Sequence, residues 1–363
     1  MTIYIFELIL ILSFAFIAKD LVFKKYILPF IFIFFSLVAG FRSSSVGEDT
    51  YHYIDVYDKI SQTSLINIKF HGIDVVYDTL YGNDLRIEIG YFLLCKIVHM
   101  MFTDVHFLFV VVALITGLLF YKFIKDNSLN IYMSTYVFLC ESMYMQSFNL
   151  MRQMLSISIA LQGYKYIRSN RLKEAIAIIL LASLFHSSTI VLLIIVPLAF
   201  IAKTKNPITF LVSTFLLFIF LLPVLGFLIT KYFPRYVSYF SNNYWMTDYG
   251  PGTILLWFAE LTLCIYLITC YKKNRIKEEN SEVLIIVMMI ILYIGLSILG
   301  YSISAFERLA LPFRAFLILF FPLSFNYINF LKPFFECILY LILGILFIKY
   351  SLTPTRIYTP FWK

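Results

Sequence analysis

The sequence contains three long stretches without Lys, Arg, Asp or Glu, at residues 175–202, 206–230 and 283–306. Each is long enough to cross a bilayer as a helix, which takes about 20 residues. Shorter charge-free stretches occur at 26–41, 105–121, 127–140 and 315–331. Overall 61% of residues are hydrophobic and 14% are charged, against about 45–50% and about 25% in a typical globular domain. The sequence therefore predicts an all-α polytopic integral membrane protein, and excludes a soluble enzyme, a disordered chain and a nucleic-acid-binding protein.

Basic residues gather in short segments between the apolar stretches, for example at 122–125, 165–173 and 272–277. Lys and Arg in short loops mark the cytoplasmic side of a membrane protein, so the net charge of +8 does not indicate binding to nucleic acid. The segments 42–86 and 231–251 are then expected on the opposite side. Counting the apolar segments predicts about 12 membrane crossings in a single transmembrane domain, residues 1–363.

Two segments do not fit a simple alternation of loops. A full crossing at residues 87–102 would invert the sidedness of every later loop, so a re-entrant or interfacial helix is predicted there. Residues 175–202 have basic clusters at both ends, which predicts a hairpin of two short helices meeting near His186. Irregular backbone at that depth is tolerated only where it is buried in protein or lines a water-filled cavity.

Four arginines are expected near the outer ends of apolar segments: Arg42, Arg86, Arg152 and Arg308. An ionisable residue at membrane depth is costly and indicates function. A planar guanidinium binds phosphate oxygens through two parallel hydrogen bonds, so arginines that converge at one level would form a strong anion site. For each arginine taken alone, a side chain that only reaches the membrane surface is the simpler interpretation.

Other polar residues accompany the arginines: Asp49, Tyr53, Glu88, Asn149, Gln153 and His186. His186 is the first candidate for a general base because imidazole titrates near neutral pH, and Asp49 and Glu88 are alternatives. Each also has a structural interpretation, with His186 as a helix-packing residue and Asp49 as a helix cap. The cysteines show no spacing typical of disulfides or of a metal site. No cofactor is expected, although Glu48 and Asp49 together could bind a divalent ion.

Several short motifs follow one another along the chain. The first and most specific is RSSSVGEDTYHY at 42–53, and it is followed by EIGY at 88–91, NLMRQ at 149–153, FHSS at 185–188 and FER at 306–308. In content and order they resemble the EpsG family of polysaccharide-synthesis membrane proteins, whose first block reads R…vG-x-D-T-x-x-Y. Glu48 stands where the family usually has a small residue.

The resemblance implies a Wzy-type polymerase of O-antigen or capsule repeat units in the bacterial inner (cytoplasmic) membrane. A growing glycan leaves undecaprenyl pyrophosphate and joins a lipid-linked repeat unit on the periplasmic side, where residues 42–86 and 231–251 are expected. The acceptor hydroxyl needs a base and the departing pyrophosphate needs cations. Arg152 and Arg308 are expected on the pyrophosphate with Arg42 in support, and His186 is expected as the base.

Further substrate-binding candidates are Arg86, Tyr53, Asn149 and Gln153. The implied partners are the undecaprenyl-pyrophosphate-linked oligosaccharide, membrane lipid and, as a candidate, a chain-length regulator protein.

Three other functions stay open. A transporter of lipid-linked oligosaccharides would share an arginine-lined cavity, but it should show an internal repeat with broken helices in matching halves, and the sequence has no repeat. A glycosyltransferase that uses polyprenyl-monophosphate sugars usually carries an early acidic pair in an outer loop, and Glu48 with Asp49 keeps this alternative. A membrane-bound O-acyltransferase would depend on His186, whose neighbours do not match that family.

Overall fold

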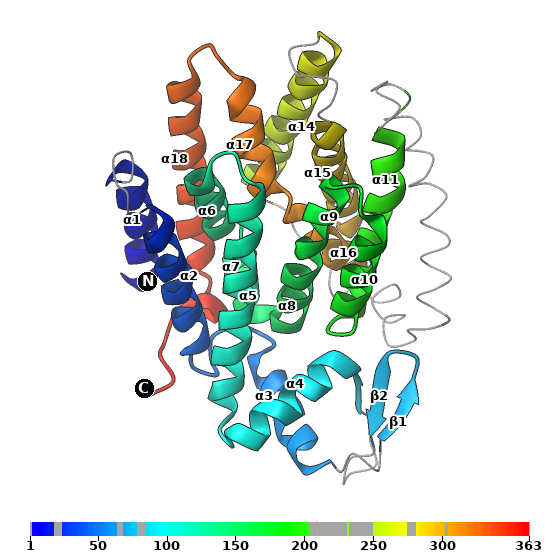
Figure 1. Ribbon diagram of the computed structural model, residues 1–363. Coiled ribbons are helices and arrows are strands. Elements are labelled where there is room, and N and C mark those ends of the chain that lie inside the picture. Colours follow the sequence, from blue (N-terminus) through cyan, green and yellow to red (C-terminus); the bar gives the residue numbers. More distant parts are fainter. Residues whose placement is uncertain are drawn as a thin grey trace. The chain divides into compact units, whose positions relative to one another are not determined.

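The computed structural model describes residues 2–17, 24–63, 68–77, 85–202, 209, 231, 250–273, 281–301 and 304–362. Within these ranges the chain is mainly helical (Figure 1) and divides into two compact units. The first unit comprises Met1–Lys165, Ala177–Ile190 and Pro333–Lys363, and the second comprises Tyr166–Ile176 and Val191–Lys332. The crossing expected within 206–230 and nearly all of the loop expected at 231–251 lie outside the described residues.

Two long helices, α2 (Lys24–Gly40) and α5 (Val105–Asn127), lie side by side in the first unit (Figure 1). Small residues at a helix interface allow the backbones to approach closely. A Cβ atom at Gly40 would lie 2.6 Å from Val110 Cα, and one at Gly117 would overlap the hydroxyl of Ser36. Any larger side chain at these two glycines would therefore separate the helices.

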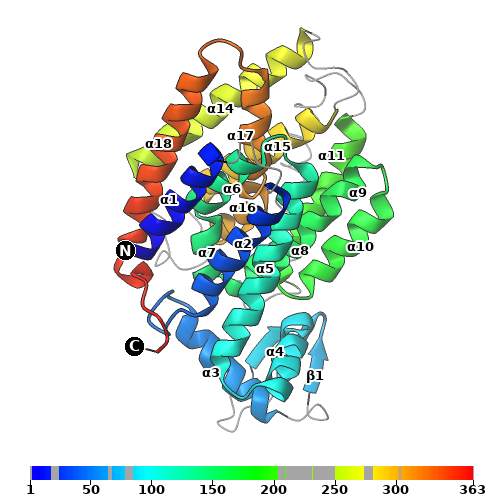
Figure 2. The same ribbon diagram turned by 60° about the vertical axis from the view of Figure 1, so that its left-hand side comes forward.

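Helices from distant parts of the sequence pack together in the same unit. α1 (Thr2–Ile17) and α18 (Lys332–Ser351) lie side by side in Figures 1 and 2, with the rings of Tyr4 and Phe347 edge to face at 6.1 Å. Beyond α18, residues 353–362 form an irregular segment with one 3-10 turn at Pro354–Arg356. We call this segment the C-terminal strap.

The chain from residue 131 to residue 168 folds as a series of short helices, separated by breaks and one 3-10 turn. They are α6 (Ile131–Cys140), α7 (Met143–Asn149), α8 (Met151–Ala160), a 3-10 turn at Leu161–Gly163, and α9 (Tyr164–Arg168). Ser142, between α6 and α7, has a φ of 63°, a left-handed conformation that costs about 1–2 kcal/mol for an L-residue and interrupts a helix. A membrane crossing by this part of the chain would therefore be broken at Ser142.

The break expected near His186 is present. α10 (Leu172–Ser183) ends just before it, and the chain continues as a 3-10 helix, η3 (Ser187–Ile194), and then as α11 (Ile195–Ala202). The helix expected at 87–102 is also present as α4 (Ile89–Met101), which has 13 residues and is too short to cross a bilayer.

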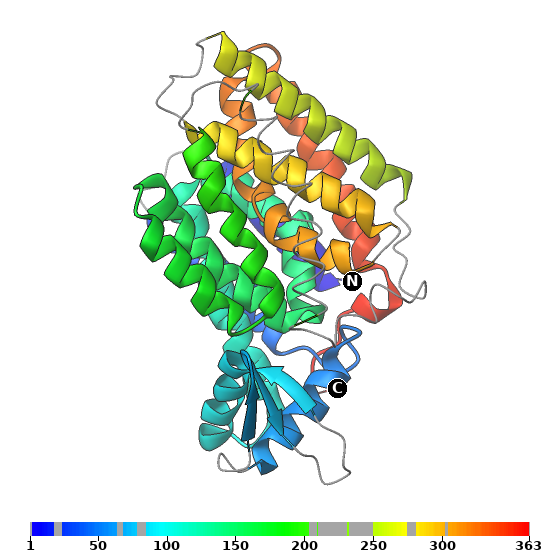
Figure 3. The same cartoon turned by 90° about the vertical axis from the view of Figure 1, so that its right-hand side faces the viewer.

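A small lobe lies at the N-terminal end of α5 and contains α3 (Thr50–Gln62), a three-stranded sheet and α4 (Figures 2 and 3). The strands β1 (Ile68–His71), β2 (Asp74–Tyr77) and β3 (Leu85–Glu88) pair antiparallel in the order β1-β2-β3. This sheet departs from the all-α expectation. Its strands have four residues each and lie in a charged loop, so the sequence pattern does not reveal them.

The lobe has its own hydrophobic core. One face of α3 contributes Tyr53, Val56, Tyr57 and Ile60, at the spacing of a helical stripe, and packs against Tyr91, Phe92, Cys95 and Val98 of α4. The core continues into α5 and α8 through Phe109, Val112, Met151 and Leu155. The lobe is therefore packed onto the helices of the first unit and is not a loosely tethered loop.

In the second unit the described helices include α11, α14 (Pro251–Lys272), α15 (Ser281–Gly300), α16 (Ser304–Arg314) and α17 (Leu317–Tyr327). Trp257 Nε1 donates a hydrogen bond to the hydroxyl of Tyr293 at 3.1 Å, which links α14 to α15. A Cβ atom at Gly300 would lie 3.0 Å from the backbone nitrogen of Glu307, so glycine permits the close approach of α15 and α16.

Four of the described helices are long and apolar enough to cross a membrane: Val105–Asn127, Pro251–Lys272, Glu282–Gly300 and Lys332–Ser351. Two further helices, Ala305–Arg314 and Leu317–Tyr327, are bent by 49° and would make a fifth crossing together. The other apolar helices in the described ranges are shorter. The helical membrane architecture is thus confirmed, whereas the count of 12 crossings stays a prediction.

Candidate functional site

Glu88 and Arg152 form an ion pair at the centre of the candidate site. Arg152 Nη1 donates to Glu88 Oε2 over 2.8 Å. Glu88 is fully buried at the junction of β3 and α4, whereas Arg152, in the first turn of α8, keeps 18% of its side chain exposed. The pair therefore places the positive charge of Arg152 at the surface and holds it through a buried carboxylate.

Ser187 completes the surroundings of Glu88. Its backbone nitrogen and its hydroxyl donate to Glu88 Oε1 at 3.2 and 3.3 Å. Gly90 follows Glu88 by two residues, and its backbone nitrogen donates to Leu184 O at 2.7 Å. A Cβ atom at Gly90 would also lie 2.7 Å from that oxygen, so glycine allows this close contact. Because Arg152 and both donors of Ser187 bond to the Glu88 carboxylate, Glu88 is arranged to hold Arg152.

His186 lies in a second set of hydrogen bonds nearby. Its Nδ1 is 2.8 Å from the hydroxyl of Ser188, which accepts a hydrogen bond from Gln153 Nε2 at 3.1 Å. The backbone carbonyl of His186 accepts from the hydroxyl of Ser156 at 3.3 Å. These contacts orient the imidazole and leave 4% of the residue exposed, so its assignment as the base stays a prediction.

Asp49 is joined to the motif at 149–153 through its backbone. Asn149 Oδ1 accepts a hydrogen bond from Asp49 N at 2.9 Å. The Asp49 side chain is half-buried at the start of α3 and makes no hydrogen bond within the described part of the chain. Just before it, Gly47 has a φ of 93°, and a Cβ atom there would lie 2.7 Å from Phe148 O. Glycine at this position therefore allows the two motifs to pack together.

Two buried tyrosine rings face the guanidinium of Arg152. Its Cζ lies 5.9 Å from the ring centroid of Tyr53 and 5.6 Å from that of Tyr91. Cations are attracted to aromatic faces at this range. Glu88 and the two rings together hold the charged group in place.

His52 lies on the exposed side of α3, three residues after Asp49. Desolvation, and after it the positive charge of Arg152, lowers the pKa of His52 below its ordinary value of 6.5, while Asp49 opposes this shift. His52 therefore lies within electrostatic reach of both Arg152 and Asp49.

Arg42 occupies a different environment, in the packed interior of the first unit. Only 1% of the residue is exposed, its Nη1 donates to Ala39 O at 2.7 Å, and its Cζ lies 4.6 Å from the ring centroid of Phe109. No carboxylate pairs with it among the described residues. Its position indicates a role inside the core, and the expected contact with pyrophosphate stays a prediction.

The remaining two arginines lie in other parts of the chain. Arg86 is exposed on β3, where it is paired in register with Val76 of β2. Arg308 belongs to α16 in the second unit, so its role stays a prediction. The first unit does bring together seven of the expected residues: Asp49, Tyr53, Glu88, Asn149, Arg152, Gln153 and His186.

The motifs that meet around Arg152 are those on which the resemblance noted in the sequence rests. The sequence profile of the EpsG family matches residues 25–362, nearly the whole chain. The chain belongs to the EpsG family. Its members are related to Wzy-like polymerases, and membership makes this chain a membrane protein of polysaccharide biosynthesis. No curated protein and no solved structure matches the chain.

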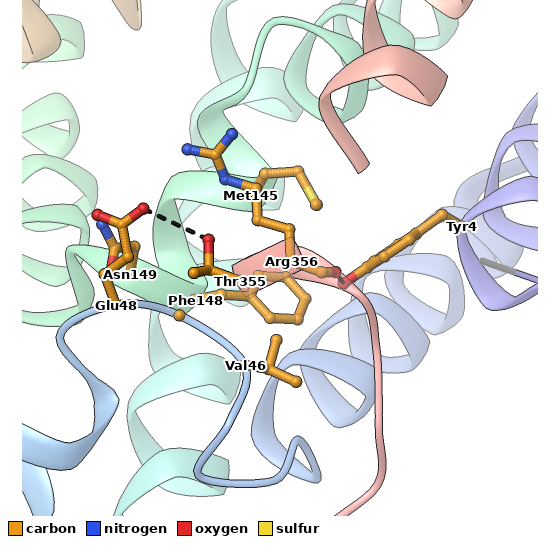
Figure 4. A pocket seen from close by; sticks show the side chains of 9 residues that line it. Tyr4, Val46, Glu48, Met145, Phe148, Asn149, Thr355 and Arg356 are labelled. Carbon is orange, nitrogen blue, oxygen red and sulfur yellow. Dashed lines mark hydrogen bonds between the residues drawn. The ribbon is translucent and has the colours of Figure 1, made fainter. Parts of the chain in front are cut away.

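The first EpsG motif is completed by the C-terminal strap. Ser43 N donates to Thr359 O and Gly47 N donates to Thr355 O, both at 2.8 Å. Between the loop and the strap is a small hollow, partly open to solvent. Figure 4 shows Glu48 on one side of this hollow and Tyr4 on the other, with Thr355 donating to Glu48 Oε1 at 3.3 Å.

Metal binding by the EpsG motif has no support from geometry in the described ranges. No three His, Cys, Asp or Glu side chains gather there in a way that would hold a metal ion. The alternative of a cation on Glu48 and Asp49 therefore lacks a third protein ligand among these residues.

Sequence reasoning assigned no role to three residues of this EpsG site. His52, Tyr91 and Ser187 all belong to the quoted motifs, so their positions were known but not their contacts. The position of His52 could have been predicted from the sequence in one respect. It follows Asp49 by three residues, and residues at this spacing lie on the same face of a helix. The contacts of Tyr91 and Ser187 depend on the tertiary packing of α4 against α8 and η3.

Proposed function

We propose that this EpsG-family protein is a glycosyltransferase that polymerises lipid-linked repeat units at the periplasmic face of the bacterial inner membrane. It transfers a growing glycan from undecaprenyl pyrophosphate to a lipid-linked repeat unit. The observation that supports this best is the setting of Arg152, a partly exposed guanidinium fixed by a buried carboxylate and two tyrosine rings. An arginine held in this way is suited to binding phosphate oxygens.

In the proposed reaction the acceptor hydroxyl oxygen bonds to the anomeric carbon of the growing glycan. The bond between that carbon and the pyrophosphate oxygen breaks, and the hydroxyl proton passes to a base. Arg152 stabilises the negative charge on the departing pyrophosphate. We assign Arg308 as a second cation and Arg42 as a supporting residue within the core.

For the base we favour Asp49. Its carboxylate is half-buried, makes no hydrogen bond within the described residues and lies within electrostatic reach of His52. His186 is the alternative, and it requires a rearrangement because it is buried. Glu88 is the least suitable of the three because Arg152 and Ser187 already occupy its oxygens.

We place the glycan beside the exposed edge of Arg152. Tyr53, Asn149 and Gln153 would shape this region, and Arg86 would extend it along β3. The partners in this proposal are the undecaprenyl-pyrophosphate-linked oligosaccharide, membrane lipid and a chain-length regulator protein.

The experiment is a gel of surface polysaccharide from a strain that lacks the protein and is complemented with variants. The parent protein should restore the ladder of repeat units, and Arg152→Ala should give a single-unit band without a ladder. Arg171→Ala is the matched control, because Arg171 pairs with Glu174 on an exposed surface at 2.7 Å. A full ladder from Arg152→Ala contradicts the proposal, and loss of the single-unit band as well indicates a transporter.

A further inference from the structure

The two helices of the small lobe expose opposite kinds of side chain. On α3 the exposed residues are Tyr51, His52, Asp55, Asp58 and Gln62, a polar face. On α4 the exposed large residues are Leu93 (45%), Ile97 (56%), Met100 (86%) and Met101 (70%). Their spacing places these four on one helical face, which we call the α4 stripe.

Both polar side chains in the middle of α4 turn away from this stripe. Lys96 Nζ donates to the backbone carbonyls of Ser61 and Thr63 at the end of α3. The ring of His99 packs edge to face against Tyr57, with centroids 5.6 Å apart. The α4 stripe therefore contains no charged group, although it is the most exposed part of the helix.

After the exposed polar residues Thr103 and Asp104, an apolar face of α5 follows the α4 stripe along the chain. Phe102, the residue after α4, stacks on Phe107 with ring centroids 4.2 Å apart. Phe107 begins a row of exposed apolar residues on α5 that continues with Ile115 and Leu118. Because α5 is long and apolar enough to cross a membrane, this row is suited to contact with lipid.

We infer that α4 lies on the bilayer surface with the α4 stripe in the lipid and the polar face of α3 in water. A surface helix of this kind buries its apolar face about 5–10 Å into the boundary between headgroups and acyl chains. Glu88 immediately precedes α4, so the helix sets the depth of the Glu88–Arg152 pair near the lipid phosphates. This last consequence rests on the proposed function, since it places Arg152 where a lipid-linked pyrophosphate lies.

The test uses the full chain in vesicles of phosphatidylethanolamine and phosphatidylglycerol, with nitroxide labels on single cysteines. The background variant is Cys337→Ser, because Cys337 is exposed and the four other cysteines are buried. Labels at Ile97→Cys and Met100→Cys are compared with matched labels at Asp58→Cys and Gln62→Cys. Collisions with oxygen, which is concentrated in lipid, are measured against collisions with a water-soluble nickel chelate.

We expect a several-fold higher oxygen-to-nickel ratio at positions 97 and 100 than at positions 58 and 62. Equal depths at 97 and 100 are also expected, because the helix lies along the surface. Preference for nickel at 97 and 100 would overturn the inference, and so would exclusion of both agents, which means that protein covers the stripe. The measurement needs no glycan transfer, so its outcome is independent of the proposed reaction.

Discussion

Glu88 and Arg152 are 64 positions apart in the sequence, yet their side chains meet at 2.8 Å. One residue ends a strand of the small lobe and the other begins a helix of the main bundle of the first unit. The ion pair therefore fixes the position of the lobe relative to α8. It also joins two motifs that are widely spaced along the chain, those at 88–91 and 149–153.

Arg152→Lys should be nearly as damaging as Arg152→Ala. Lysine keeps the positive charge, but it lacks the planar guanidinium. Arginine can use one edge of that group for Glu88 and another edge for a phosphate at the same time. The expected result on the polysaccharide gel is a single-unit band with the ladder lost, at unchanged protein level. A full ladder from the lysine variant would show that only the positive charge is needed. It would contradict the proposed hydrogen bonding of the guanidinium to phosphate oxygens.

Glu88→Gln should reduce the stability of the protein by about 1–3 kcal/mol, because Arg152 loses its charged hydrogen-bond partner in a mostly buried setting. Thermal unfolding in detergent, followed by circular dichroism, measures the change. Glu174→Gln, in an exposed pair with Arg171, is the control and should leave unfolding unchanged. If Glu88→Gln unfolds at the parent's temperature, Glu88 does not anchor Arg152.

The stability should fall as the pH drops below about 6.5, in part because of His52. The pKa of His52 is lowered in the folded protein, so the unfolded chain binds more protons in this range. The stabilising contribution of His52 is fully present above pH 6.5. It decreases as the pH falls and is lost once the pH reaches the folded-state pKa of His52. Thermal unfolding at several pH values should show a smaller acid loss for His52→Gln, and an identical pH profile for parent and variant would exclude this contribution.

Gly47→Ala should impair the site more than Gly72→Ala does. Both glycines have positive φ values, 93° and 64°, so alanine is strained at each. At Gly47 the new methyl group would also meet Phe148 O at 2.7 Å, whereas nothing lies within 4 Å at Gly72. The ladder on the gel should shorten or disappear for Gly47→Ala only, and equal effects from both variants would point to backbone strain alone.

The sequence was sufficient to predict those features that depend on local pattern. Apolar length and charge spacing predicted the short helix α4 and the break before Ser187, and both are present. The expected outer ends of the apolar segments predicted that Asn149, Arg152 and Gln153 lie at the same level as Glu88, and Arg152 does contact Glu88. Each of these inferences needs only residue types and their spacing.

Features set by tertiary contacts were beyond the sequence pattern. Arg42 ends an apolar helix, as a surface anchor would, and its burial follows from Phe109 and Phe148, which lie in other helices. The three short strands pair across a loop in which charges and aromatic residues mix. No periodicity distinguishes such strands from irregular loop.

The first EpsG motif receives two of its backbone acceptors, Thr355 O and Thr359 O, from the C-terminal strap, more than 300 positions later. During synthesis the early helices enter the membrane long before those residues leave the ribosome. The backbone amides of Ser43 and Gly47 can therefore form these hydrogen bonds only after nearly the whole chain has been translated. A chain that ends before residue 355 would lack both of these acceptors for Ser43 N and Gly47 N.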